Sequence, residues 1–185
     1  MTRFPRRALL TGAAATLTLA ACGNGVGSSG SSNIDARVAS SLSFLDNQYP
    51  GTRDLRDKSV GMLVMPLITQ ASFGFGGAYG KGALLVNEVT VDYYSATAAS
   101  FGIQAGAQQY SHVLYFMTEE ALAEFRASPG WSAGANVQYV FNDDGGNLSA
   151  NTTTALAPVI AVVFGQAGLL AGVSVEGTKY TRIIP

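Results

Sequence analysis

Hydrophobic residues recur at helical spacing in two parts of the chain. The first predicts a helix over 34–48, capped by Asn33, with an apolar face formed by Ile34, Val38, Leu42 and Leu45. A short helical turn over 52–57 is expected to follow it. The second predicts a helix over 119–128, where Thr118 is the N-cap and two glutamates occupy the first turn.

Elsewhere the pattern has the short apolar runs and alternation of β-strands. We expect strands at 60–66, 82–94, 101–110, 112–117, 131–141 and around 178–184. Residues 145–175 carry no charged side chain, but their proline and glycines favour two buried strands joined at GQAG over a membrane-spanning helix. The pattern predicts an α+β fold: a mostly antiparallel sheet, curled or barrel-like, with an N-terminal helix and one further helix packed on it.

The stretch SFGFGGAYGKGALLV at 72–86 holds five glycines around Lys81. It is not a dinucleotide fingerprint, because the third glycine position falls on Tyr79 or Leu85. It is not a nucleotide P-loop either, since Gly82 stands where the serine or threonine is required. Glycines in strands allow bends and close backbone approach, so we predict a packing role. The alternative is a binding edge centred on Lys81.

The first 21 residues have the form of an export signal. Arginines precede an apolar run that is too short to span a bilayer, and the run ends in LAAC at 19–22. This ending resembles a bacterial lipobox, which predicts that Cys22 is acylated and that residues 1–21 are removed. An ordinary secretory signal with a chance cysteine is the alternative. The pair Arg6-Arg7 leaves both the Sec and the twin-arginine export route open.

The predicted domain organisation follows from this leader. Residues 22–33 form the acylated cysteine and a flexible Gly/Ser tether, and residues 34–185 form one domain. Gly23 stands where an aspartate would signal retention in the inner membrane. We therefore expect a lipid-anchored protein of the outer membrane that faces the periplasm.

Charge narrows the range of partners. The leader takes 3 of the 11 basic residues and none of the 12 acidic ones, so 11 − 3 = 8 basic residues face 12 acidic ones in the mature chain. A net negative domain is a poor binder of nucleic acid. Attraction to an anionic membrane would have to come from a local cluster of basic side chains.

Few residues offer catalytic or metal chemistry. His112 is the only histidine and Cys22 the only cysteine, so a metal site built from several of these ligands is excluded and no cofactor is expected. Glu120 and Glu124 are expected on a solvated helix face. The segment NDDGGN at 142–147 lacks the spacing of a calcium loop and predicts a hairpin turn. We expect no enzyme; a hydrolase using His112 is the weaker alternative.

Three separated blocks resemble one known family. GMLVMP…ASFGFGGAYGKGALLV, FMTEEALAEF and GLLAGVSVEGTK are together similar to SYLF domains, over roughly 34–183. The resemblance implies a β-rich lipid-binding domain without catalysis. Eukaryotic members of this family bind phosphoinositides and, in yeast, actin filaments. The resemblance leaves the lipid head group open here.

Basic and aromatic residues of these blocks form our candidate lipid site. It consists of Lys81, Lys179, Arg182, Tyr79 and Tyr180. The expected function is binding of phospholipid or a membrane surface by a tethered domain. The alternative is an envelope scaffold whose partner is another protein. The sequence leaves the oligomeric state open.

Overall fold

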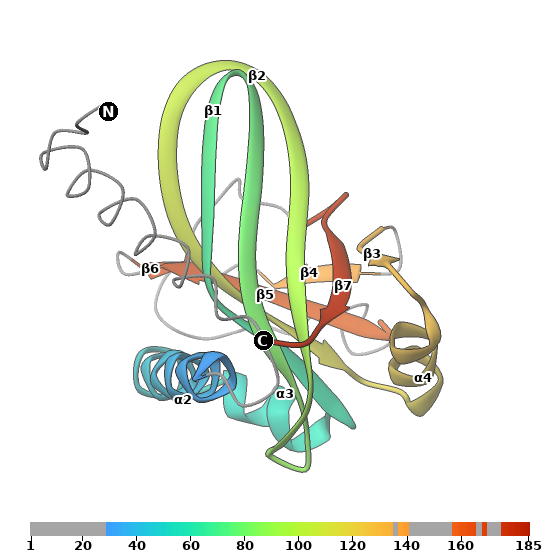
Figure 1. The fold of residues 1–185 in the computed structure, drawn as a ribbon. Coiled ribbons are helices and arrows are strands. Elements are labelled where there is room, and N and C mark those ends of the chain that lie inside the picture. The colour runs from blue at the N-terminus through green and yellow to red at the C-terminus, as the bar shows by residue number, and fades with distance from the viewer. Residues whose placement is uncertain (1–28, 135–136, 141–156, 166–167, 170–174) are drawn as a thin grey trace, which may run out of the picture.

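A single long β-hairpin organises the molecule (Figure 1). The structure is a computed structural model, and it describes residues 29–134, 137–140, 157–165, 168–169 and 175–185. Strand β1 (Gly61–Val86) pairs with β2 (Val89–Phe116) along its whole length, from Gly61 opposite Phe116 to Val86 opposite Val89. Within the described residues, no helix has the length and apolarity needed to cross a membrane.

The hairpin turns at Asn87 and Glu88, whose φ angles are 49° and 64°. These left-handed conformations reverse the chain in two residues, as a tight hairpin requires. The expectation of one strand over 82–94 was therefore wrong, because the chain reverses in the middle of it. The strand expected at 60–66 is part of β1, and the strands expected at 101–110 and 112–117 are parts of β2. The glycine run itself lies in β1.

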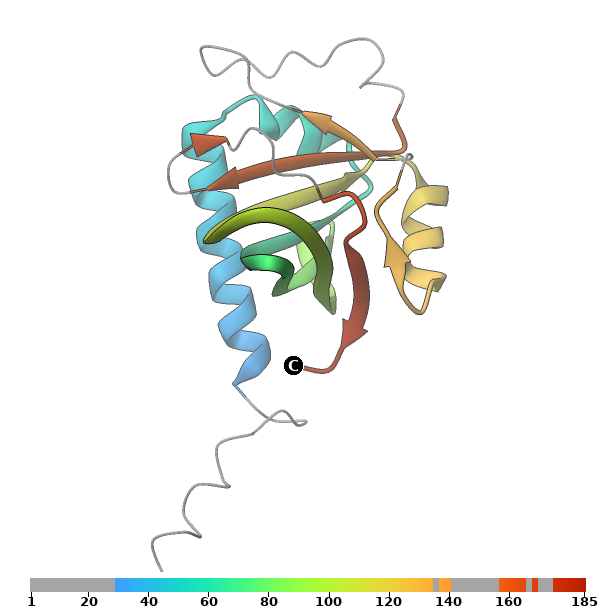
Figure 2. The ribbon, with the colours of Figure 1, turned by 90° about the horizontal axis from the view of Figure 1, so that it is seen from above.

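The hairpin bends into an arch, with β2 as the outer strand and β1 as the inner one (Figures 1 and 2). Ser72 lies opposite Gly106 and Gly74 lies opposite Gly102. Over this stretch β2 is therefore four residues long where β1 is two residues long. A strand on the outside of a bend must be longer, and such a bulge supplies the extra length.

The second half of β1, at Gly80 and Gly82, packs against its first half, at Val64 and Leu67. A Cβ atom added at Gly82 would overlap the Val64 carbonyl oxygen, and one added at Gly80 would overlap that of Leu67. Only glycine allows two backbones to come this close. The predicted packing role of the glycine run is confirmed at these two positions.

Five short strands complete one seven-stranded sheet. The outer edge of β2 pairs antiparallel with β7 (Lys179–Ile183) at one end and with β5 (Val159–Gly165) at the other. The remaining strands extend these edges: β3 (Trp131–Ser132) on β7, β6 (Gly168–Leu169) on β5, and β4 (Val137–Val140) parallel to β5. The predicted α+β fold with a curled, mostly antiparallel sheet is confirmed.

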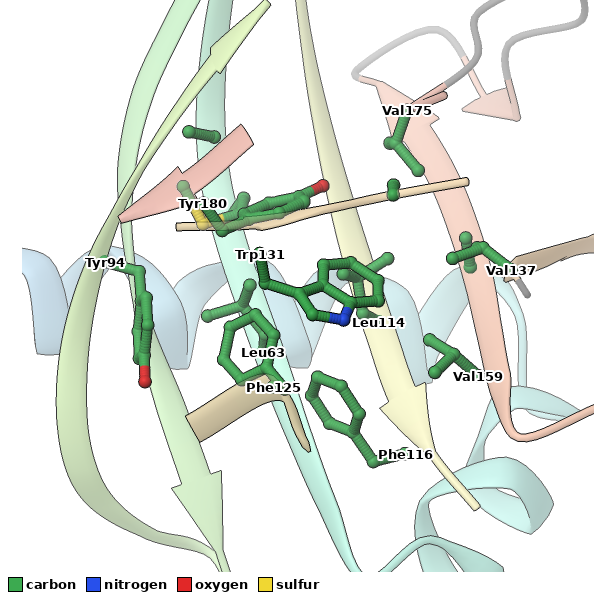
Figure 3. Packing of buried hydrophobic residues seen from close by; sticks show 14 of the residues in the cluster. Leu63, Tyr94, Leu114, Phe116, Phe125, Trp131, Val137, Val159, Val175 and Tyr180 are labelled. Carbon is green, nitrogen blue, oxygen red and sulfur yellow. The ribbon is translucent and has the colours of Figure 1, made fainter. Parts of the chain in front are cut away.

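The inner face of the sheet holds the larger core. Helix α4 (Glu119–Ala127) contributes Leu122 and Phe125 to it, and aromatic rings from four elements meet around Phe125 (Figure 3). The Phe125 ring lies 4.9 Å from Phe116, 5.4 Å from Trp131 and 4.7 Å from Tyr94, measured between centroids. Burial of each such side chain contributes about 2–3 kcal/mol. The core thus closes the open side of the curl.

The outer face of the sheet is covered by α2 (Gly30–Gln48) and α3 (Thr52–Lys58). Alternation along β1 explains the two cores, because Leu63 and Met65 point inward while Met62 and Val64 point outward. The second core also contains Ile34, Val38 and Leu45 of α2.

Helix α2 is also held by polar contacts. Asp35 accepts hydrogen bonds from the Tyr93 hydroxyl at 2.8 Å and the Thr90 hydroxyl at 3.1 Å. The helix begins at Gly30, so Asn33 lies inside it and is not its N-cap. The predicted cap of α4 is confirmed, since the Thr118 hydroxyl accepts a hydrogen bond from the Ala121 amide at 3.2 Å.

The segments after α4 differ from the expectation in one respect. The expected strand over 131–141 is two short strands, β3 and β4, which join different edges of the sheet. The last expected strand is confirmed as β7. The proposed hairpin turn at 142–147 lies outside the described residues.

Candidate functional site

Three of the five candidate lipid-site residues share the outer face of the sheet. Tyr79 lies opposite Thr97, and Thr97 opposite Lys179, so these residues form one row across β1, β2 and β7. Lys81 lies in the next outward-facing row, two positions along β1. Tyr79 is 52% exposed, Lys179 is exposed, and the aliphatic stem of Lys179 lies against Gly130.

The other two candidates lie on the inner face. Tyr180 is fully buried, and its hydroxyl is 2.8 Å from Nε2 of His112, which makes a buried hydrogen bond. Arg182 forms an ion pair with Asp92 at 3.3 Å, and the same carboxylate lies 3.5 Å from Arg126. The structure therefore separates these two residues from Tyr79, Lys81 and Lys179 by the thickness of the sheet.

His112, the one candidate for hydrolytic chemistry, is completely buried in the inner core. Burial lowers the pKa of His112 to about 3, because the apolar surroundings disfavour the charged ring. Its Nδ1 atom has no hydrogen-bond partner among the described residues. At neutral pH this histidine is an uncharged core residue. No group of three metal-ligating side chains comes together within the described part of the chain.

A surface groove runs along α2, where the helix crosses the bend of β1. Its first hollow has a volume of about 450 Å³ and a mostly apolar lining. Phe44 of α2 and Phe164 of β5 stack at 6.1 Å between ring centroids at this end. Pro66 and Leu67 of β1 also line this hollow. The volume lies within the range of small-molecule sites.

The second hollow continues the groove toward the start of α2 and has a volume of about 350 Å³. Arg37, Pro66 and Leu67 line both hollows, so the two are continuous. The outward-facing Tyr79 and Lys81 line the second hollow, together with Gly30, the first residue of α2. The lining of both hollows contains Arg37 and Lys81 and no aspartate or glutamate, and Pro185, the last residue of the sequence, also lines the second hollow.

Neither cation of the groove is neutralised within the described residues. Arg37 and Lys81 are absent from the ion pairs of that part of the chain, whereas Arg56, Arg126 and Arg182 each pair with an aspartate. The groove therefore combines apolar walls at one end with positive charge at the other. We call Arg37, Phe44, Leu67, Lys81 and Phe164 the groove residues.

The wall of the groove is set by an irregularity in β1. Met65 lies opposite His112 and Ile68 opposite Tyr110, so β1 carries one extra residue at Pro66-Leu67. The Ser111 hydroxyl donates a hydrogen bond to the Pro66 carbonyl at 2.7 Å, which fixes this bulge. Proline within a strand is a signal for such a bulge. Sequence reasoning used Pro66 only as a strand end and did not identify Arg37, Phe44 or Phe164 as site residues.

The described chain is a small α+β domain with a groove on its surface. Residues 97–182 match the model of a family described as "Ysc84: Las17-binding protein actin regulator", which is the SYLF family. This part of the chain, from the middle of β2 to β7, belongs to that family, and the SYLF resemblance is confirmed. Curated proteins gave no match.

Proposed function

We propose that this chain is an exported lipoprotein, acylated at Cys22, whose SYLF-type domain binds anionic phospholipid without catalysis. The observation that carries the proposal is the groove, in which an apolar trough leads to two cations without an ion-pair partner among the described residues. An amphiphile with one negative group and one hydrocarbon chain is complementary to this arrangement, because its negative group would face the cations and its chain would face the apolar trough.

The groove matches such a ligand at both ends. A phosphate between Arg37 and Lys81 would receive charge-assisted hydrogen bonds, and the guanidinium can supply two of them in parallel. An acyl chain directed toward Phe44 and Phe164 would leave water for an apolar lining. Exposed Lys179, on the same face as Lys81, would extend the positive surface beyond the groove.

The anchor would hold this groove close to a bilayer. Cys22 is eight residues from Gly30, where α2 begins, and eight extended residues span at most about 28 Å. Gly30 itself lines the second hollow, so the cationic end of the groove is the end nearest the tether. The outer membrane, facing the periplasm, is the location that the leader favours. Several acyl chains on one cysteine give stable anchoring, whereas one chain gives marginal binding.

A protein partner is the second candidate, and the family description favours it. That description names binding to another protein and regulation of actin. For this chain the corresponding function is an envelope scaffold whose exposed surface contacts another protein, while the acyl anchor alone contacts lipid. Binding by the unacylated domain distinguishes the two functions.

The experiment is vesicle co-sedimentation with residues 22–185 carrying Cys22→Ser, which contain every described element and cannot be acylated. Zwitterionic and anionic vesicles are compared at two salt concentrations. We expect binding to anionic vesicles that weakens at high salt. Each basic residue near an anionic surface is worth about 1 kcal/mol, so Arg37→Glu with Lys81→Glu should weaken binding by at least about 30-fold.

The matched control is Arg53→Glu with Lys58→Glu on α3, which changes the charge equally outside the groove. It should weaken binding much less. A second pair, Lys81→Glu with Lys179→Glu, tests the whole cationic face. Unchanged binding in both pairs that contain Lys81→Glu would refute the lipid site. Absence of binding to any vesicle would leave Cys22 as the membrane contact and favour the scaffold.

A further inference from the structure

Part of the outer edge of β2 has no partner strand among the described residues. The outer side of β2 pairs with β7 up to Thr97 and with β5 from Ser111 onward. Between these points, over 98–110, the partner of β2 among the described residues is β1 alone. This segment forms the outside of the arch, away from the helices (Figures 1 and 2). We call residues 98–110 the arch edge.

The composition of the arch edge does not protect it against pairing. Its sequence, AASFGIQAGAQQY, contains no charge and no proline. Charged side chains and proline are the usual means by which exposed strand edges avoid partners. Outside the strand ladders, the backbone hydrogen bonds of the described chain involve none of residues 98–99 and 106–110. Among the described residues, the amide and carbonyl groups on this side of β2 therefore have no partner strand.

The arch edge is also suited to pairing with itself. The two extra residues of β2 lie between Gly102 and Gly106, and four residues remain on either side, at 98–101 and 107–110. In antiparallel pairing about a two-fold axis at residue 104, residues 98–101 of each copy lie opposite residues 107–110 of the other copy. The bulge then lies at the centre, where both copies bend alike. No like charges meet, because the segment has none.

We propose that the arch edge pairs with the arch edge of a second copy of this chain, which joins two arches into one four-stranded ribbon. Along a strand, the amide and carbonyl groups of every second residue point away from the existing partner strand. Roughly six residues of the arch edge in each copy would therefore contribute to the new ladder. The hydrocarbon of a bilayer cannot replace this partner, because an open strand edge leaves backbone groups without hydrogen bonds there. The absence of charge thus favours a second strand over membrane insertion.

The test uses residues 22–185 with Cys22→Ser, whose mass is measured by sedimentation velocity over a dilution series. We expect a dimer that dissociates on dilution. In the symmetric register Ala99 faces residue 109 of the other copy, and both positions are exposed. Ala99→Lys with Gln109→Lys therefore places like charges opposite each other twice and should weaken dimerisation by about tenfold or more.

Two further variants make the result specific. Ala123→Lys with Gln48→Lys introduces the same charges at exposed positions of α4 and α2 and should leave the dimer unchanged. Ala99→Lys with Gln109→Glu places opposite charges across the same axis and should restore dimerisation. Far-ultraviolet circular dichroism checks that each variant is folded.

Three outcomes would overturn the proposal. They are a parent chain that stays monomeric at every concentration, a dimer that the double lysine variant does not weaken, and a double lysine variant that loses vesicle binding while the parent is monomeric. The last outcome would assign the arch to the bilayer. None of these results depends on Arg37 or Lys81, so this proposal and the lipid groove can fail separately.

Discussion

A glycine-to-alanine series along the hairpin tests how the arch is packed. At Gly82 an added methyl group would overlap the Val64 carbonyl oxygen and lie 2.5 Å from Sδ and 3.0 Å from Cα of Met65. Two of these three atoms belong to the backbone, which cannot move aside without shifting β1. Overpacking of this kind costs about 1–3 kcal/mol, while alanine returns about 0.4–1 kcal/mol by restricting the unfolded chain. We expect Gly82→Ala to destabilise the fold by about 1–2 kcal/mol.

Two glycines of the same hairpin serve as controls. A Cβ atom at Gly106 meets nothing within 4 Å, and one at Gly77 lies 3.6 Å from the Ala98 carbonyl oxygen, an ordinary contact. Alanine at either position should leave stability unchanged or raise it slightly. Urea unfolding followed by the fluorescence of Trp131, the single and buried tryptophan, measures all three variants. A Gly82→Ala midpoint equal to that of the parent, or an equal loss at Gly106, would refute the close-packing argument.

Three smaller predictions concern stability. The folded pKa of His112 is about 3 and the unfolded value is 6.5, so only the unfolded chain takes up this proton as the pH falls below 6.5. Stability should therefore drop by about 1.4 kcal/mol per pH unit toward pH 5, and urea titrations of His112→Gln should lack this slope. Thr118→Ala removes the α4 cap and should cost about 1 kcal/mol in the same assay. Asp35→Ala leaves Thr90 and Tyr93 without their acceptor and should lower the free energy of unfolding by about 1–3 kcal/mol; no loss would show that these bonds do not hold α2.

The helices and the last strand could be predicted because their signals are local. Helical spacing in 34–48, a cap at Thr118 and alternation near residue 180 depend on near neighbours in sequence. The long hairpin could not be predicted in this way. Its turn uses Asn87 and Glu88, and glutamate is not a turn signal at positive φ. The glycine run has no hydrophobic alternation to mark it as strand.

The candidate site also combines features with a local sequence signal and features that depend on long-range contacts. Tyr79 and Lys81 were named from the glycine run without a strand assignment, and the structure places them two positions apart on β1, lining one hollow. Tyr180 and Arg182 also share a face, but only the pairing of β7 with β2 decides that this face is the inner one. Arg37 lies 44 residues before Lys81 in the chain, and the two meet because α2 crosses β1 at the Pro66 bulge. No local pattern encodes such a crossing.

The two proposed surfaces would reinforce each other on a membrane. The groove lies along α2, next to the tether, whereas the arch edge lies at the outside of the hairpin (Figure 1). The proposed anchoring through Cys22 would confine every copy to one layer and raise the local concentration of arch edges, so that weak pairing would become substantial there. A pair of chains in turn carries two anchors and two grooves, and dissociation from the bilayer then requires the release of all of them. Charge reversal in the groove should change the affinity of a single chain for lipid, while charge at the arch edge should change the number of chains that bind together and, through it, the avidity for the membrane.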